Sequence, residues 1–184
     1  MIIISIISRI SNDKNWFIDI VRLADILEKK NFGDFEINFI GAIEDENIRT
    51  NIEALAQEMN LGSKIKFSGK SISLLQLNPY IQNGYFINFV IGDFLGYSSI
   101  ECLKLGFKTF FYNVDPTITK SDVDDKNTSM NIDDLAFSLL ELKTNKIETD
   151  EKIMSDNKSR LKNYELNDDE VKFLKGMILL GKNV

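Results

Sequence analysis

The chain has 184 residues, enough for one domain with a substantial hydrophobic core. Hydrophobic residues make up 43% and charged residues 27%, as in a soluble globular protein, and the formal net charge of −6 disfavours nucleic acid as a partner. The sequence contains no histidine and one cysteine, Cys102. These counts exclude an intramolecular disulfide and any catalytic site that needs imidazole. Chemistry here must use carboxylates, lysine, arginine, hydroxyl groups or backbone dipoles.

The chain opens with an apolar run over residues 2–7. No basic residue precedes the run and no small-residue cleavage site follows it, so we predict a buried strand rather than a signal peptide. No segment has the length of a membrane span, and we expect the protein to be cytoplasmic.

Short apolar runs alternate with helical patterns along the first two thirds of the chain. Strands are predicted at residues 2–7, 35–40, 65–68, 85–91 and 108–112. Helices are predicted at residues 15–30, 45–59, 73–82 and 97–105, the third broken near Asn78-Pro79. This alternation predicts an α/β fold, a doubly wound parallel (Rossmann-like) sheet with helices on both faces.

The last third of the chain has a different pattern. We predict a single domain over residues 1–184, with a core at 2–113, a loop at 114–130 and a helical tail at 131–181. Tail helices are predicted at residues 132–142, 149–164 and 168–180, the second as a lysine-rich surface helix. Cys102 is expected to be a core residue, because nothing in the sequence would activate its thiol.

Ligands of such sheets bind at the carboxyl ends of the strands, beside helix N-termini. The first of these loops carries Arg9 and Lys14, two cations that could bind a diphosphate. The alternative is that Arg9 pairs with Asp13 or Asp19, while Lys14 is only solvated. On this loop alone the alternative is favoured.

The loop after the fourth strand carries two carboxylates near a predicted helix start at Gly96. Asp93 and Glu101 could each accept hydrogen bonds from sugar hydroxyl groups, and the glycine would let a ligand approach the backbone. The alternative is a surface pair between Glu101 and Lys104, with Asp93 as a helix cap. The loop by itself does not separate these interpretations.

Together these features resemble the C-terminal, nucleotide-sugar-binding domain of GT-B glycosyltransferases, specifically the retaining family 4, or group 1, enzymes. The resemblance covers residues 3–112 and rests on four landmarks in order. These are the Arg9–x4–Lys14 pair, a strand ending at Gly41, a strand–glycine turn ending at Gly69, and an acidic–x7–Glu motif formed by Asp93, Gly96, Glu101 and Gly106. The implied fold is one half of a GT-B enzyme.

The resemblance implies catalytic roles for Arg9 and Lys14 at the donor diphosphate, and for Asp93 at the transferred sugar. Asp93 is one methylene shorter than the glutamate usual in the family. The donor-binding residues that the resemblance implies are Gly41, Lys70, Ser71, Ile72, Leu95, Gly96, Tyr97 and Glu101. It implies no metal and no cofactor besides the nucleotide-diphosphate sugar, which is the donor substrate.

The implied function is retaining transfer of a hexose to a polysaccharide or lipid-linked acceptor, in the cytoplasm or peripherally at the inner face of the membrane. A complete GT-B enzyme is about twice this long, so the expected partner is an N-terminal acceptor-binding domain or subunit, without which the chain should transfer little. The alternative is a non-catalytic GT-B-like interaction module with a degenerate donor pocket. A sugar-nucleotide epimerase of GT-B architecture is a more distant alternative, because such enzymes usually use histidine.

Overall fold

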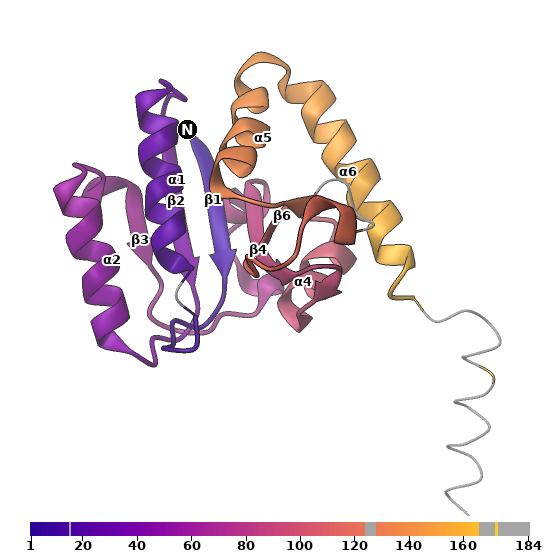
Figure 1. Cartoon of the computed structure of the whole chain (residues 1–184), viewed down its shortest axis with the longest axis horizontal. Coiled ribbons are helices and arrows are strands. Elements are labelled where there is room, and N and C mark those ends of the chain that lie inside the picture. Colours follow the sequence, from indigo (N-terminus) through magenta and orange to yellow (C-terminus); the bar gives the residue numbers. More distant parts are fainter. Residues whose placement is uncertain (15, 124–127, 166–171, 173–184) are drawn as a thin grey trace, which may run out of the picture.

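A computed structural model describes residues 1–14, 16–123, 128–165 and 172 of the chain (Figure 1). Within these residues the strands form a seven-stranded sheet with the order β3-β2-β1-β4-β6-β7, and β5 pairs with β4. All neighbours along this order are parallel, and only β5 runs antiparallel to its partner. The strands are β1 Ile2–Ile7, β2 Phe35–Ile40, β3 Ile65–Phe67, β4 Tyr85–Ile91, β5 Phe94–Leu95, β6 Lys108–Asn113 and β7 Thr128–Ser129. The doubly wound parallel sheet expected from the sequence is confirmed.

Helices cover both faces of this sheet. Their bounds are α1 Phe17–Lys29, α2 Glu46–Glu58, α3 Pro79–Gln82, α4 Tyr97–Lys104, α5 Ile132–Thr144 and α6 Lys146–Lys162. The main core packs α1, α2 and α5 against one face, and contains fully buried side chains such as Ile6, Phe17 and Leu139. The other face packs against α3 and α4, where Phe86 and the expected core residue Cys102 are fully buried. The apolar faces of α1, α2, α4 and α5 thus assign these helices to one layer each.

Several helix starts follow from local sequence. The side chain of Asp45 accepts a hydrogen bond from the Asn47 amide at 2.9 Å and caps α2. The side chain of Asn131 caps α5 in the same way, through the Asp134 amide at 2.8 Å. The predicted break before Pro79 is also observed, since a short 3-10 helix at Leu74–Gln76 ends before α3 begins.

Two features of the structure were not predicted from the sequence. Helix α6 exposes most of its residues, as expected of a surface helix, but it also buries Ile153, Asn157 and Arg160 and contacts both β6 and α4. Its apolar residues are spaced too widely to show a clear stripe, which is why the sequence pattern missed this burial. The two-residue strands β5 and β7 were also missed, because they are too short to show an alternation. The predicted helix at residues 168–180 lies outside the described residues, apart from position 172.

Candidate functional site

The strand order brings five chain segments to one edge of the sheet. The strands run parallel, so the loops after β1, β2, β3, β4 and β6 all leave at their carboxyl ends, at the lower edge in Figure 1. The chain winds outward from β1 through β2 to β3, then crosses to β4 on the other side of β1. Neighbouring loops after β1 and β4 therefore diverge to opposite faces, which makes the point between them the expected ligand site of such a sheet.

The loop after β1 is held against the loop after β2 by backbone hydrogen bonds. The Ile10 amide donates to the Ala42 carbonyl at 2.9 Å, and the Glu44 amide donates to the Ile10 carbonyl at 2.8 Å. Gly41 is buried between the loops, and a Cβ at this position would lie 2.1 Å from the carbonyl oxygen of Ser8. The absence of a side chain at Gly41 is therefore required for packing, whatever ligand the site takes.

Arg9 lies exposed at the carboxyl end of β1 and is engaged by two carboxylates. Its guanidinium is 3.0 Å from Glu44 and 3.3 Å from Asp13. The sequence offered Asp13 or Asp19 as partners; Asp13 is confirmed, whereas Asp19 instead accepts hydrogen bonds from Arg22 and Tyr112. Glu44 was missed, because only the folded loops bring it beside a residue 35 positions earlier in the sequence.

Lys14 turns back onto its own loop instead of extending into solvent. Its Nζ donates to Ser8 Oγ at 2.7 Å and to the Arg9 carbonyl at 3.5 Å. Burial and the nearby Arg9 charge lower the pKa of the Lys14 ammonium. The two cations of the Arg–x4–Lys pair are thus held together beside the switch point, before α1 begins.

Tight turns shape the loop after β4. Gly92 has φ of +59°, and its amide donates to Asn113 Oδ1 at 2.9 Å. The chain then folds back, and β5 pairs with the end of β4 through Val90↔Leu95. Asp93 therefore lies exposed in a hairpin turn rather than serving as a cap of α4, and its carbonyl accepts a hydrogen bond from the Tyr164 hydroxyl at the end of α6.

The N-terminus of α4 is open. Gly96 is the N-cap residue, and among the described residues no side chain caps the helix there and no atom would lie within 4 Å of a Cβ added at Gly96. The first amides of a helix lack partners within it, so this end can hold an anion or a sugar hydroxyl. Leu95 beside it is buried, whereas Tyr97 is 84% exposed.

Glu101 lies one turn into α4 and is only partly buried. Its carboxylate makes no hydrogen bond or ion pair with the other residues that the structure describes. The pair with Lys104, offered by the sequence as a structural explanation, is not formed. The carboxylate of Glu101 thus lies near the N-terminus of α4 and forms no interaction that stabilises the fold.

The loop after β3 joins the site through Ser68. Ser68 Oγ accepts from the Gly41 amide at 3.0 Å and donates to the Lys70 carbonyl at 2.8 Å. Lys70 and Ser71 are exposed at this edge, whereas Ile72 packs against the apolar cluster beneath α4. Two of the three residues expected to border the base are thus accessible, and Ile72 contributes mainly to packing.

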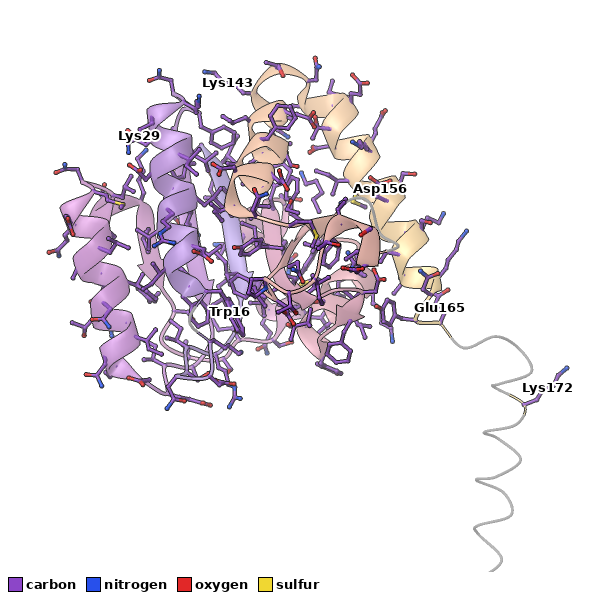
Figure 2. The ribbon with its side chains drawn as sticks, in the orientation of Figure 1. Trp16, Lys29, Lys143, Asp156, Glu165 and Lys172 are labelled. Carbon is purple, nitrogen blue, oxygen red and sulfur yellow. The ribbon has the colours of Figure 1, made fainter. Side chains whose placement is uncertain are left out.

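Three buried polar atoms near the switch point were not found from the sequence. Ser5 Oγ on β1, Asn88 Nδ2 on β4 and Trp16 Nε1 before α1 have no hydrogen-bond partner among the described residues. Figure 2 shows Trp16 at the end of α1 nearest the carboxyl edge. Ser5 and Asn88 are single polar residues in largely apolar strands, and the sequence does not show that their polar atoms lack partners.

The described residues contain no group of three or more acidic or cysteine side chains placed to hold a metal ion. None of the helices described is long and apolar enough to cross a membrane.

Comparison with solved structures identifies the fold. The chain superposes on a glycosyltransferase from Rickettsia africae ESF-5 with a TM-score of 0.63 and 19% identity, covering 100% of this chain and 49% of that one. It also matches the C-terminal domain of LpcC, a glycosyl transferase group 1 family protein from Francisella tularensis, with a TM-score of 0.61 and 18% identity, covering 90% of this chain and 87% of that domain. The chain has the fold of a group 1 glycosyltransferase C-terminal domain.

A third structure, TarM, gives a TM-score of 0.60 at 19% identity, with 97% of this chain and 34% of TarM covered. The chain thus spans about half of the Rickettsia enzyme and a third of TarM, but most of the isolated LpcC domain. No protein-family model and no curated protein matches the sequence. The expected fold, one half of a GT-B enzyme, is therefore confirmed by structural superposition.

Proposed function

We propose that the chain is the donor-binding part of a glycosyltransferase and binds a nucleotide-diphosphate sugar between the loops after β1 and β4. The observation that carries this proposal is the pairing of two kinds of group at the switch point. Cations at Arg9 and Lys14 stand on one side, and the open N-terminus of α4 with the unused carboxylate of Glu101 stands on the other. The two cations suit a diphosphate, and the helix N-terminus with its nearby carboxylate suits the hydroxyl groups of a ribose.

In this proposal Arg9 and Lys14 bind the diphosphate and stabilise the charge that develops on it as the glycosidic bond breaks. Arg9 would exchange Glu44 and Asp13 for phosphate oxygens. Lys14 would move from Ser8 Oγ to the ligand, and the donor's negative charge would oppose the lowering of its pKa by burial and by Arg9.

Glu101 accepts hydrogen bonds from the ribose hydroxyl groups, while Asp93 contacts the transferred hexose. Because Asp93 is one methylene shorter than the glutamate usual in the family, a water would bridge this contact. The amides at Leu95, Gly96 and Tyr97 approach the phosphate or sugar. Lys70 and Ser71 border the base. The donor diphosphate would require no metal ion, because the cations and the N-terminus of α4 supply the positive field.

The acceptor, in this proposal, binds to a second domain or subunit facing the carboxyl edge, as in the two-domain organisation that the resemblance to family 4 implies. The reaction would retain the configuration of the hexose, and the acceptor would be a polysaccharide or a lipid-linked glycan. Support for this wider scheme is that the chain matches about half of the Rickettsia glycosyltransferase.

A second candidate is a non-catalytic module of the same fold. Two observations favour it: Arg9 is already neutralised by two carboxylates, and Asp93 is shorter than the family's glutamate. An epimerase of this architecture has less support, although the chain also superposes on a structure described as a UDP-N-acetylglucosamine 2-epimerase from Listeria monocytogenes, with a TM-score of 0.51.

Calorimetric titration separates the first two candidates. The ligands are UDP, GDP, CDP, ADP and dTDP with their common sugar conjugates, and the proteins are the native chain, Arg9→Ala and Glu101→Ala. Arg22→Ala, an exposed arginine on α1 that pairs with Asp19, is the matched control. Donor binding by one nucleotide, lost in both site variants and kept in the control, supports the proposal. Absence of binding to every nucleotide favours the non-catalytic module.

A further inference from the structure

A hollow lies away from the switch point, between α5, α6, β6 and the edge strand β7. Its volume is about 310 Å³, at the lower end of the range for ligand pockets. A water molecule occupies about 30 Å³ in the liquid, so the hollow has room for about ten water molecules. This number is comparable with the number of non-hydrogen atoms in one hexose. Figure 1 shows α5 and α6 diverging from their connecting turn, and residues of both helices line the hollow.

The walls present hydrogen-bonding groups that the fold does not use. Ser129 on β7 and Thr149 on α6 are buried residues whose hydroxyl groups make no hydrogen bond with the described residues. The carboxylate of Glu141 on α5 and the ammonium of Lys152 on α6 likewise make neither hydrogen bond nor ion pair there. The hollow therefore offers two groups that donate and accept, one that only accepts and one that only donates.

An aromatic ring completes the set. Phe137 lines the hollow from α5 and is 66% exposed, which is unusual for a phenylalanine in a helix that also contributes to the core. It lies four residues before Glu141, so ring and carboxylate share one face of α5. An apolar face beside convergent polar groups suits a ring that has C–H bonds on one side and hydroxyl groups around its edge.

We propose that this hollow is a binding site for a neutral sugar, distinct from the donor site. An apolar ligand would leave the hydroxyl and charged groups unpaired, which is costly. An anion is disfavoured because carboxylates outnumber ammonium groups by three to two among the lining residues, a balance that includes Asp156 (Figure 2). A polyhydroxyl ligand can pair with each of these groups, since every hydroxyl both donates and accepts. The site does not depend on the proposed donor function.

Nuclear magnetic resonance of the full chain tests the site, with glucose, N-acetylglucosamine and maltotriose as probes and glucose 6-phosphate as the anionic comparison. The variants are Phe137→Ala and Glu141→Gln. Their matched controls are Tyr80→Ala, another exposed aromatic residue, and Glu148→Gln, an exposed carboxylate on α6. Thermal melting of each variant establishes that it is folded.

We expect at least one neutral sugar to shift amide signals of α5 and α6 with millimolar affinity. Glu141→Gln should weaken this binding about tenfold, as for loss of a charged hydrogen-bond acceptor, and the controls should not. UDP should leave these signals unchanged. The inference is overturned if no neutral sugar shifts them at about 50 mM, or if Phe137→Ala and Glu141→Gln bind as the native chain does. Tighter binding of glucose 6-phosphate than of glucose would overturn the neutral-sugar assignment.

Discussion

Replacing Glu44 by glutamine should strengthen diphosphate binding, because it removes a carboxylate that competes for Arg9. The guanidinium lies 3.0 Å from Glu44, and both side chains are about half exposed, at 52% and 47%. A diphosphate that binds Arg9 must displace this carboxylate or share the guanidinium with it. Glutamine keeps the shape of the side chain and removes its charge.

The size of the effect follows from the exposure of the pair. Exposed ion pairs contribute about 0.2–1 kcal/mol, and 1.4 kcal/mol corresponds to a tenfold change in affinity. Glu44→Gln should therefore raise the affinity for a diphosphate by about 1.4- to 5-fold. Because the screening length shrinks from about 10 Å at 0.1 M salt to about 3 Å at 1 M, the gain should be largest at low ionic strength.

The assay is calorimetric titration with inorganic pyrophosphate and with the best nucleoside diphosphate, at low and high salt. Glu46→Gln is the control, since Glu46 lies two residues further on and pairs with Arg49 rather than Arg9. In an Arg9→Ala background the Glu44→Gln change should have no further effect, which completes a double-mutant cycle. Unchanged or weaker binding by Glu44→Gln in the native background would refute the idea that this carboxylate competes with the ligand.

Three further predictions concern stability and reactivity. Gly41→Ala should lower the free energy of unfolding by about 1–3 kcal/mol, because its Cβ would lie 2.1 Å from a carbonyl oxygen. The control Gly96→Ala should melt close to the native chain, and equal melting temperatures of the two variants would contradict this prediction. Stability should fall as the pH rises above about 10, because burial and hydrogen bonds to aspartates raise the pKa of Tyr85 and Tyr112 in the folded state, so that the unfolded chain releases these protons first. Urea unfolding across this range measures the slope, which Tyr112→Phe should reduce; a flat profile would refute it. Burial raises the pKa of the Cys102 thiol to about 12, so iodoacetamide should label it only on unfolding, and rapid labelling of the native chain would show that the thiol is accessible.

Regular elements could be predicted from the sequence because each has a strong local signal. The apolar run of β4 was placed at Tyr85–Ile91, the bounds that the structure gives it. Asp45 and Asn131 mark helix starts through side-chain caps, which are local interactions. The burial of α6 was not predictable in this way, since it depends on contacts of Ile153 and Arg160 with strands far away in the sequence.

The candidate site was predictable only as a set of residue types on particular loops. The sequence placed Arg9, Lys14 and Glu101 at the carboxyl edge, and the topology agrees. It did not predict which of these groups form ion pairs. The pairing of Arg9 with Glu44 depends on backbone hydrogen bonds between two loops, and the unpaired carboxylate of Glu101 depends on where α4 directs its side chain. Asp93 was expected beside the helix start, but the two-residue strand β5 moves it into a hairpin turn.

Mapping the bound donor onto the backbone would show whether the donor site lies between the loops after β1 and β4. Amide chemical shifts of the native chain would be followed during titration with the nucleotide sugar that binds best. We expect saturable shifts in the loop from Arg9 to Lys14 and in the segment from Gly92 to Glu101, which flank the switch point between β1 and β4. Shifts confined to another surface, or none with any nucleotide sugar, would contradict a donor site at this edge of the sheet.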